Sequence, residues 1–253
     1  MKSKNILKLA VYAGEMMLMY GAETYRVEDT IRRICISGGI PFAESFVTPT
    51  GIFVSVEDAN GEILSMIKRI ENRSIDLNKV SLINDFSRQF AKGKISVEEG
   101  FIILDKIKTM KKYNVLTRML CGGVGSAFFT LIFGGSYMDS LATLVIATVV
   151  EYILIFLDKY NLSLFFINIL GGFVTAIMSI GLVNIGLGDH IDKVIIGTIM
   201  TMVPGVALTN AIRDTISGDL VSGSSRAEEA LIIAIAVAAG IGSILNLYLK
   251  FWR

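Results

Sequence analysis

The sequence predicts a polytopic α-helical membrane protein, with a five-helix transmembrane bundle preceded by a small α/β cytoplasmic domain. Of the 253 residues, 53% are hydrophobic and 19% are charged, and the mean hydropathy of +0.61 exceeds that of an ordinary soluble domain. The charges are segregated, because residues 1–118 hold 18 Lys or Arg and 14 Asp or Glu, whereas residues 119–253 hold 6 and 9. The second half also contains five apolar stretches, each close in length to the roughly 20 residues that a membrane-spanning helix needs.

These observations divide the chain into a cytoplasmic domain over residues 1–115 and a transmembrane domain over residues 116–253. Buried helices of a soluble protein would be shorter and more often interrupted by polar residues. Charged residues bound the spans, which are expected at about 119–135, 138–157, 162–187, 194–212 and 230–249.

Basic residues near the span ends predict the orientation. Five of them crowd the approach to the first span, and the loop GGSYMDS after that span has none. Basic residues are retained on the cytoplasmic side of a membrane. The N-terminal domain is therefore expected in the cytoplasm, and the loop that holds His190 is expected on the outer side. An odd number of spans places the C-terminal end outside. The five basic residues are Lys106, Lys108, Lys111, Lys112 and Arg118.

The charged half has the pattern of an α/β domain. Helical periodicity covers residues 4–20 and 23–37, and Gly21 separates the two helices. Apolar and polar residues alternate over FAESFVTPTGIFVSVED, where Thr48-Pro49-Thr50-Gly51 has the composition of a turn, so a β-hairpin is expected. EILSMIKRI is a candidate third strand, and two more helices are expected at about 78–91 and 96–112.

Several functional classes are disfavoured. A net charge of +1 lacks the basic face that a nucleic-acid partner requires. Cys35 and Cys121 form no metal-ligand pattern, and His190 is the only histidine, so neither a metal nor another cofactor nor a hydrolytic triad is expected. No phosphate-binding loop is present. The chain is therefore not expected to be an enzyme, and no catalytic residue is assigned.

Glu151 lies well inside the second predicted span, where an ionised carboxylate without a partner is costly. It should face the bundle interior or a wet cavity, with Thr148 one turn before it, and this would suit proton-coupled transport. In the alternative interpretation it lies near the inner headgroups, two turns from Asp158, or pairs structurally with Arg213 or another cation.

Pro204 predicts a break in the fourth span. Proline has no amide hydrogen, so the carbonyl of Met200 loses its helical partner, and Gly205 loosens the turn further. In transporters such broken helices expose backbone groups that bind polar substrates near the membrane midplane. The alternative is a kinked helix that ends in a solvated loop.

Beyond the break, polar residues are concentrated. Asn210, Arg213 and Asp214 are spaced i, i+3, i+4 and share one helical face. An arginine fork could bind a substrate carboxylate, although ordinary ion pairs would explain the same charges. A Gly/Ser-rich connection follows and carries Ser217, Asp219, Arg226, Glu228 and Glu229.

At this segment the chain resembles a known family. The run PGVALTNAIRDTISGDLVSG is similar to the signature of the threonine/serine exporter family, specifically its N-terminal five-span component, and GAETYRVEDTIRRI with FVTPTGIFVSVE is similar to the family's cytoplasmic motif. Ala207 departs from the proline that many relatives carry. The matching residues are Pro204, Gly205, Asn210, Arg213, Asp214, Asp219 and Arg226 in the membrane signature, and Gly21, Glu23, Arg26, Glu28, Pro49 and Gly51 in the cytoplasmic motif.

The resemblance implies export of small amino acids such as threonine or serine, driven by the membrane potential or a proton gradient. One close branch is implicated instead in export of the dicarboxylate succinate by a two-protein assembly. Full-length members fuse this half to a second group of about five spans, and this sequence stops after the first group. A second small multi-span membrane protein is therefore the expected partner, besides membrane lipid and the small-molecule substrate.

The cytoplasmic motif has two interpretations. Glu23 with Arg26, Glu28 with Arg32, and Asp29 with Arg33 have the spacing of local helical ion pairs. Alternatively, the motif makes a gating contact with the segment around Arg213, since both are expected on the cytoplasmic side.

The leading hypothesis is a secondary exporter subunit in which Glu151 and the broken fourth helix line the path. A membrane-anchored sensor or scaffold is the second hypothesis, and it predicts a bound soluble factor and no flux. A membrane hydrolase is the third, and it would require activity in the cytoplasmic domain alone.

Overall fold

The computed structural model describes residues 2–111, 113–160 and 162–252, and within them the chain forms two compact units. The first unit combines the N-terminal region up to Lys111 with the distant segment Gly205–Glu228, and the second holds Lys112–Pro204 with Glu229–Arg253. The elements of the first unit are α1 (Lys2–Met19), α2 (Thr24–Ser37), β1 (Phe42–Thr48), β2 (Gly51–Glu57), β3 (Ile63–Arg69), α3 (Leu77–Ala91), α4 (Val97–Thr109) and α9 (Gly205–Ile216).

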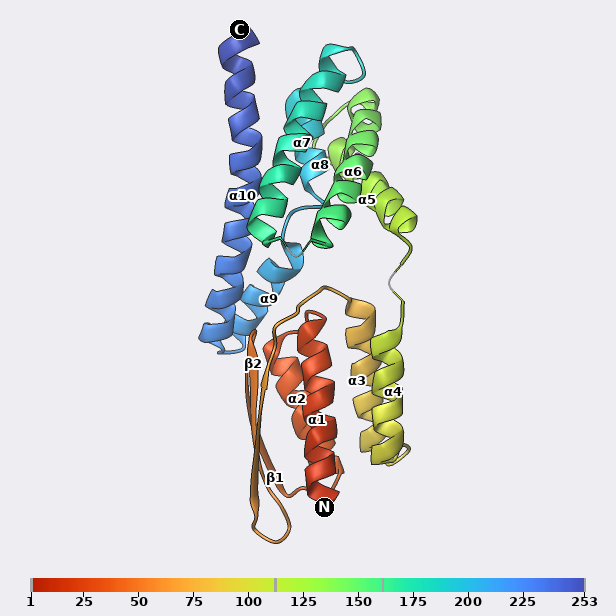
Figure 1. Ribbon diagram of the computed structural model, residues 1–253, viewed down its shortest axis with the longest axis vertical. Helices are drawn as coiled ribbons and strands as arrows, with labels where there is room; N and C mark the ends of the chain where they lie inside the picture. Colours follow the sequence, from red (N-terminus) through yellow and green to blue (C-terminus); the bar gives the residue numbers. More distant parts are fainter. Residues whose placement is uncertain (1, 112, 161, 253) are drawn as a thin grey trace. The chain divides into compact units, whose positions relative to one another are not determined.

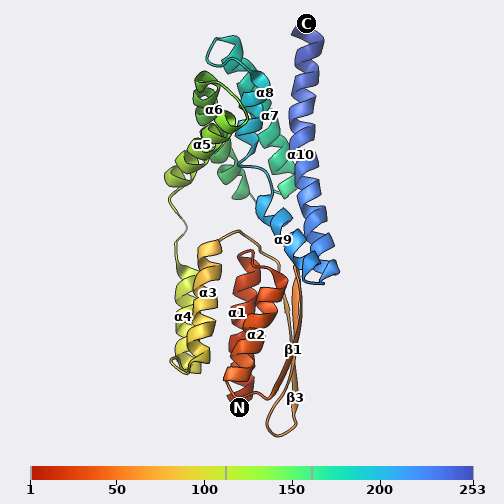
Figure 2. The same cartoon turned by 180° about the vertical axis from the view of Figure 1, so that it is seen from behind.

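The N-terminal part of the first unit has three layers. Figures 1 and 2 show α1 and α2 between an antiparallel sheet of order β1-β2-β3 and the pair α3–α4. Helix α1 is the centre of the core, because ten of its 18 residues are buried, which is more than an amphipathic surface helix requires. The sheet turns alternate side chains inward, including Val47, Ile52, Val54 and Val56.

The predicted hairpin and the candidate third strand are both present. Thr48 lies opposite Gly51 at the turn between β1 and β2, and Phe53 lies opposite Phe46 on one side and Ile67 on the other. The helices expected at 78–91 and 96–112 correspond to α3 and α4. A capping box between Ser96 and Glu99 fixes the start of α4.

The second unit is helical. Its elements are α5 (Val115–Ile132), α6 (Tyr137–Asp158), α7 (Leu164–Asn184) and α8 (Ile191–Ile199), together with most of α10, a helix that runs from Leu220 to Trp252. In the part of the chain that the structure describes, α5, α6, α7 and α10 are the four helices long and apolar enough to cross a membrane.

Four of the five predicted spans are therefore helices long and apolar enough to cross a membrane, and the predicted span at 194–212 is not. The region 194–212 is not one helix, because α8 ends at Ile199 after nine residues and α9 begins at Gly205. The physical reason is the predicted one: Pro204 cannot donate to the helical ladder, and a tight turn replaces the helix before it. In addition, α9 belongs to the first compact unit, together with the first turns of α10.

The Gly/Ser-rich connection is also shorter than expected. Only residues 217–219 are non-helical, and α10 already begins at Leu220. Asp219 caps this helix, since its Oδ1 accepts the Ser222 amide at 3.0 Å. Small residues are tolerated in the first turns because α9 lies close by: a Cβ on Gly223 would lie 3.0 Å from the carbonyl oxygen of Ala211.

Close helix packing characterises the second unit. A Cβ on Gly172 of α7 would lie 2.7 Å from the carbonyl oxygen of Val237, and one on Gly240 of α10 would lie 2.4 Å from that of Ile169. Glycines at such crossings let helix backbones approach in an apolar environment, where packing holds helices together.

Candidate functional site

The start of α2 is completed by a side chain from α9. Helix α2 has no acidic residue in its first turn and receives no side-chain cap from Glu23. Instead, Asp214 Oδ1 accepts the Thr24 amide at 3.1 Å and the Thr24 hydroxyl at 2.9 Å. Unpaired amides and the helix dipole both favour a carboxylate at this position. Asp214 therefore caps a helix that lies 190 positions away in sequence.

Asp214 also faces a buried arginine. Arg226 Nε lies 3.0 Å from Asp214 Oδ2, and their side chains are only 8% and 0% exposed. The two atoms are close as an ion pair, although they are not aligned as a hydrogen bond. Burial raises the pKa of Asp214, while the hydrogen bonds from Thr24 and the charge of Arg226 oppose this shift. Arg226 Nη2 also donates to the carbonyl of Ala22 at 2.8 Å.

A shared hydroxyl links this pair to the start of α10. Thr24 Oγ1 lies 3.1 Å from Asp219 Oδ2 as well as 2.9 Å from Asp214 Oδ1. A hydroxyl has one proton, so the two carboxylates compete for it. Asp219 uses its other oxygen to cap α10 through Ser222. The starts of α2 and α10 are consequently held by one polar cluster.

The loop before α2 supplies backbone acceptors to the same cluster. Gly21 has φ +89°, a conformation that residues with a Cβ rarely adopt. Its carbonyl accepts the buried Asn210 side chain at 2.9 Å. Asn210, Arg226 and Asp214 thus bind Gly21, Ala22 and Thr24 in turn, around the start of α2.

A groove of about 520 Å³ lies beside the cluster. The buried carboxylate of Glu23 lies between two guanidinium groups, with Arg213 Nη1 at 2.5 Å and Arg26 Nε at 3.1 Å. The arginine side chains are 54% and 37% exposed, so further N–H donors are available to a ligand. The groove is lined by Gly21, Glu23, Arg26, Leu77, Val80, Ser81, Asn84, Gly205, Val206, Thr209, Asn210 and Arg213.

This arrangement can bind a small carboxylate. An arginine fork matches the two oxygens of a carboxylate, and charge assistance makes such bonds stronger than neutral ones. Glu23 sits between the two forks and offers a site for a cationic group of the same ligand.

Three residues of the cytoplasmic motif lie outside this cluster. Glu28 Oε1 accepts the amide of Val47 at 3.0 Å and ties α2 to β1. Burial raises the pKa of Glu28, and the hydrogen bond from Val47 opposes that shift. Pro49 and Gly51 lie at the turn of the β1–β2 hairpin. The hairpin meets α10 where Ser222 Oγ donates to the Val47 carbonyl at 3.4 Å.

Glu151 lies in the second unit and pairs with Arg118, whose Nη2 is 3.4 Å from Glu151 Oε1. The alternative interpretation, in which Glu151 pairs with a cation, thus holds with Arg118 as the cation and not Arg213. Glu151 also lies close to the helix break: a Cβ on Gly122 would be 3.6 Å from Glu151 Cγ and 3.5 Å from Thr201 Cγ2. The predicted role of Glu151 in a substrate path stays a prediction.

Sequence reasoning missed Thr24, Ser222 and the polar centre of the second unit. Asp139 is fully buried and accepts two N–H groups at Oδ1, from Asp189 at 2.7 Å and His190 at 2.8 Å. Its Oδ2 lies 2.9 Å from both the Ser136 amide and His190 Nδ1. The spacing of Ser136 and Asp139, a capping box, was the available signal. Asp139, Asp189 and His190 are close enough to hold a metal ion, but the Asp139 oxygens are already occupied by protein groups, which favours a structural role.

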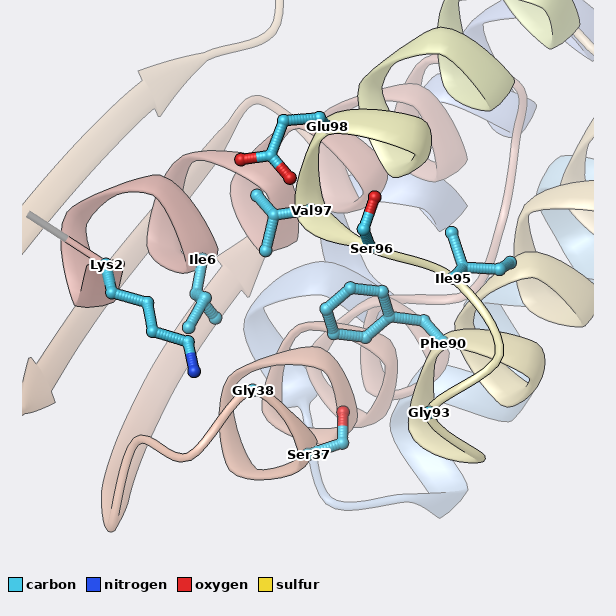
Figure 3. Close-up of a pocket in the computed structure, with 10 residues that line it drawn as sticks. All are labelled: Lys2, Ile6, Ser37, Gly38, Phe90, Gly93, Ile95, Ser96, Val97 and Glu98. Atoms are coloured by element: carbon cyan, nitrogen blue, oxygen red, sulfur yellow. The ribbon is translucent and has the colours of Figure 1, made fainter.

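A second cavity, of about 460 Å³, lies at the other end of the helical layer (Figure 3). Its lining combines apolar side chains, among them Ile6, Phe90 and Val97, with the polar side chains of Lys2, Ser37, Ser96 and Glu98. The hydroxyl of Ser96 is used within the capping box of α4. The two charged residues of this lining, Lys2 and Glu98, are exposed.

The fold defines a polytopic helical membrane protein with a polar unit attached to it. The chain belongs to the threonine/serine exporter family, whose model matches residues 8–248. The sequence is 22% identical over 245 residues to the "Threonine/serine exporter" of Corynebacterium glutamicum, covering 94% of this chain and 50% of that protein. It is 19% identical over 241 residues to the "Probable threonine/serine exporter" of Mycobacterium tuberculosis, covering 94% and 45%.

The chain therefore spans about half the length of these two relatives. A different relative matches over its whole length: the "Probable succinate transporter subunit YjjP" of Escherichia coli is 21% identical over 257 residues, covering 99% of this chain and 98% of that protein. No solved structure matches the chain.

Proposed function

We propose that the chain is a subunit of a secondary exporter that moves small amino acids of the threonine/serine type out across the cell membrane. The observation that carries this proposal is the groove in which Glu23 lies between Arg26 and Arg213. A free amino acid carries a carboxylate and an ammonium group. Arg26 and Arg213 would bind the first, and Glu23 would bind the second.

A dicarboxylate is the second candidate substrate, because relatives that match over nearly their whole length are named as succinate transporter subunits. The two substrates differ in their need for Glu23. A dicarboxylate has no ammonium group, so Glu23→Gln should abolish threonine or serine flux and spare succinate flux.

The membrane path would include the broken helix. Residues 205–228 share one compact unit with the N-terminal region, which supports a topology in which both lie on one side of the membrane. The helices α5, α6 and α7 cross three times, and the chain must therefore return between Asn184 and Gly205 before α10 crosses again. This gives five crossings, with the N-terminal unit in the cytoplasm by the charge rule.

The returning segment is α8 followed by the turn at Met200–Pro204. Nine helical residues cover about 14 Å, roughly half of a hydrocarbon core about 30 Å thick. Irregular backbone at this depth requires protein or water around it, and α8 packs against α5, α6 and α7. Glu151 and Thr201, which converge around Gly122, would line this path, and Glu151 is the candidate for proton coupling.

A second membrane subunit is the proposed partner. The word subunit in the names of the Escherichia coli and Klebsiella aerogenes relatives supports an assembly with another protein. A small multi-span protein would supply the remaining walls of the path.

Flux measurements test the proposal. Vesicles that contain this chain and its partner should export threonine, serine or succinate in response to a gradient, and Arg213→Ala or Glu151→Gln should reduce the flux at least tenfold. Arg88→Ala, an exposed arginine of the same unit as Arg213, is the control and should leave flux unchanged. Unaltered flux in Arg213→Ala would refute the substrate site. Absence of flux with any partner, together with a tightly bound soluble factor, would favour a sensor or scaffold.

A further inference from the structure

The outer edge of strand β3 is open. The order β1-β2-β3 leaves β1 and β3 at the two edges of the sheet. The edge of β1 is covered near Val47, whose amide binds Glu28 and whose carbonyl accepts from Ser222. Across the described residues, no hydrogen bond from a side chain or another strand reaches the outer backbone groups of β3. Such an edge is a template for a further strand.

Two hydrogen bonds show which groups of β3 face that edge. The carbonyl of Glu62 accepts the Asp58 amide at 3.0 Å, and the Ile70 amide donates to Thr50 at 2.9 Å. Even-numbered residues of this strand therefore direct their backbone groups toward β2. In an antiparallel ladder the direction alternates, so Ile63, Ser65, Ile67 and Arg69 direct their N–H and C=O groups outward.

The same residues place apolar side chains on the open face of the sheet. Ile63 and Ile67 are 69% and 72% exposed, although isoleucine is among the residues most often buried. Across the sheet, Ile67 continues a row with Phe53 and Phe46, which are themselves about half exposed. An exposed apolar row that ends at an open edge indicates a covered surface in the working assembly.

We propose that β3 pairs antiparallel with β3 of a second copy of this chain, with the two-fold axis at Ser65. This register places Ile63 opposite Ile67 of the second copy and Glu62 opposite Lys68 of the second copy. Cross-strand apolar pairs and opposite charges both stabilise such a ladder. A closed two-fold contact of this kind is the commonest form of homo-oligomer.

Other registers fit less well. A shift by one residue places odd-numbered residues of one β3 strand opposite even-numbered residues of the other. The even-numbered backbone groups already bond to β2, so the hydrogen bonds between the two β3 strands cannot form. A shift by two places Ile63 opposite Arg69 or Ser65, and it separates Glu62 from Lys68. Lys68 already pairs with Glu15 of its own chain at 3.0 Å, so Glu62 of the second copy would join an existing ion pair. Strand β3 is complementary to an antiparallel copy of itself in both its apolar and its charged side chains. We therefore infer that the strand paired with this edge belongs to a second copy of the chain.

Cysteine cross-linking tests the register. In a Cys121→Ser background, Ser65→Cys places two thiols across one pair of strands, about 5 Å apart, whereas Ser55→Cys places them three strand spacings apart, roughly 14 Å. Ser55 and Ser65 are neighbours on the same face, with their hydroxyls 3.1 Å apart, so Ser55 is the control position next to Ser65 on the adjoining strand. A short bifunctional thiol reagent should give covalent dimers of the Ser65 variant only. Equal cross-linking of both variants would indicate face-to-face stacking and overturn the proposal.

The mass of the full chain in detergent provides the second test. The unsubstituted chain should dimerise, and Ile67→Lys should weaken the dimer at least tenfold, because it sets a charge against Ile63 at two symmetric places. Ile102→Lys on α4 is the control, since Ile102 is 68% exposed and lies away from the sheet. A monomeric unsubstituted chain, or an Ile67→Lys dimer as stable as the control, would contradict the pairing. Neither measurement depends on transport, so the proposal stands or fails separately from the exporter function.

Discussion

At the scale of single residues, Asp214 of α9 joins the start of α2 to Arg226 of α10, which no local sequence pattern predicts. It caps α2 through Thr24 and neutralises Arg226, and both charged side chains are almost completely buried. Removing one member of a buried pair leaves the other charge without compensation, which costs more than the intact pair contributes.

Asp214→Asn should accordingly destabilise the protein by about 3 kcal/mol. Thermal unfolding in detergent should show a midpoint lower by roughly 10 °C, at about 2–4 °C per kcal/mol. Asp29→Asn is the matched control, because Asp29 forms an exposed pair with Arg33 on α2 and should shift stability by less than about 0.5 kcal/mol. Equal unfolding midpoints for the two variants would show that the contacts of Asp214 do not stabilise the protein.

His190 allows a prediction about pH, because it is the only histidine in the chain. Its hydrogen bond to Asp139 raises the pKa of His190 above the ordinary value of 6.5. The stabilisation that this bond provides is complete below pH 6.5 and is lost as pH rises through the higher pKa of the folded state. The single imidazole resonance in an NMR titration should have its midpoint above pH 6.5, and Asp139→Asn should lower that midpoint. A midpoint at 6.5 in both proteins would exclude the pair in solution.

The residue scale also shows what the sequence can and cannot predict. The local pairs Glu23–Arg26 and Asp29–Arg33 follow from helical spacing and are present. The pairing of Glu28 with Arg32 was expected on the same ground, but Glu28 binds the Val47 amide. The contact between Asp214 and Thr24 joins positions 190 residues apart, and no periodicity carries information on such a contact. The contact between Glu23 and Arg213 is likewise long-range, so helical spacing could predict the local ion pairs of the cytoplasmic motif but not this contact.

At the scale of elements, periodicity and proline located the helices, and tertiary packing decided where two of them belong. Helices α8 and α9 are separated at Pro204 as the sequence predicts, yet α9 joins the first unit because its polar face meets the loop before α2. The early start of α10 has a similar cause. Gly and Ser normally indicate a loop, but here Gly223 permits the close approach of α10 to α9.

Gly223→Ala should therefore disturb this helix pair. The new Cβ would lie 2.1 Å from Thr215 Oγ1 and 3.0 Å from the carbonyl oxygen of Ala211, and overpacking of this kind costs about 1–3 kcal/mol. Gly242→Ala in the same helix meets no atom within 4 Å and should be neutral or stabilising by up to about 1 kcal/mol. The midpoints of thermal unfolding compare the two variants. A stabilised Gly223→Ala protein would mean that α9 and α10 are not packed as described.

At the scale of the whole molecule, membrane topology follows from the assignment of segments to the compact units. Three long helices separate residues 2–111 from the loop before α8, and residues 205–228 belong with the N-terminal region. The number of long helices alone would put the segment at Ser217 on the same side as the loop at Leu187. In the proposed topology this segment lies on the same side as the first unit, opposite to Leu187, so the two interpretations make different predictions.

Single cysteines in the Cys121→Ser background distinguish them. Asn60, Ser217 and Leu187 are all exposed and lie at a hairpin turn, the α9–α10 turn and the α7–α8 loop. A membrane-impermeant thiol reagent applied to intact cells should label Leu187→Cys and leave Asn60→Cys and Ser217→Cys unlabelled until the membrane is opened. Labelling of Ser217→Cys together with Leu187→Cys would mean that the chain does not cross the bilayer through α8 and the turn at Pro204. In that case the broken helix could not line a path, because a path through the membrane requires this short segment to reach the side on which Arg213 meets Glu23.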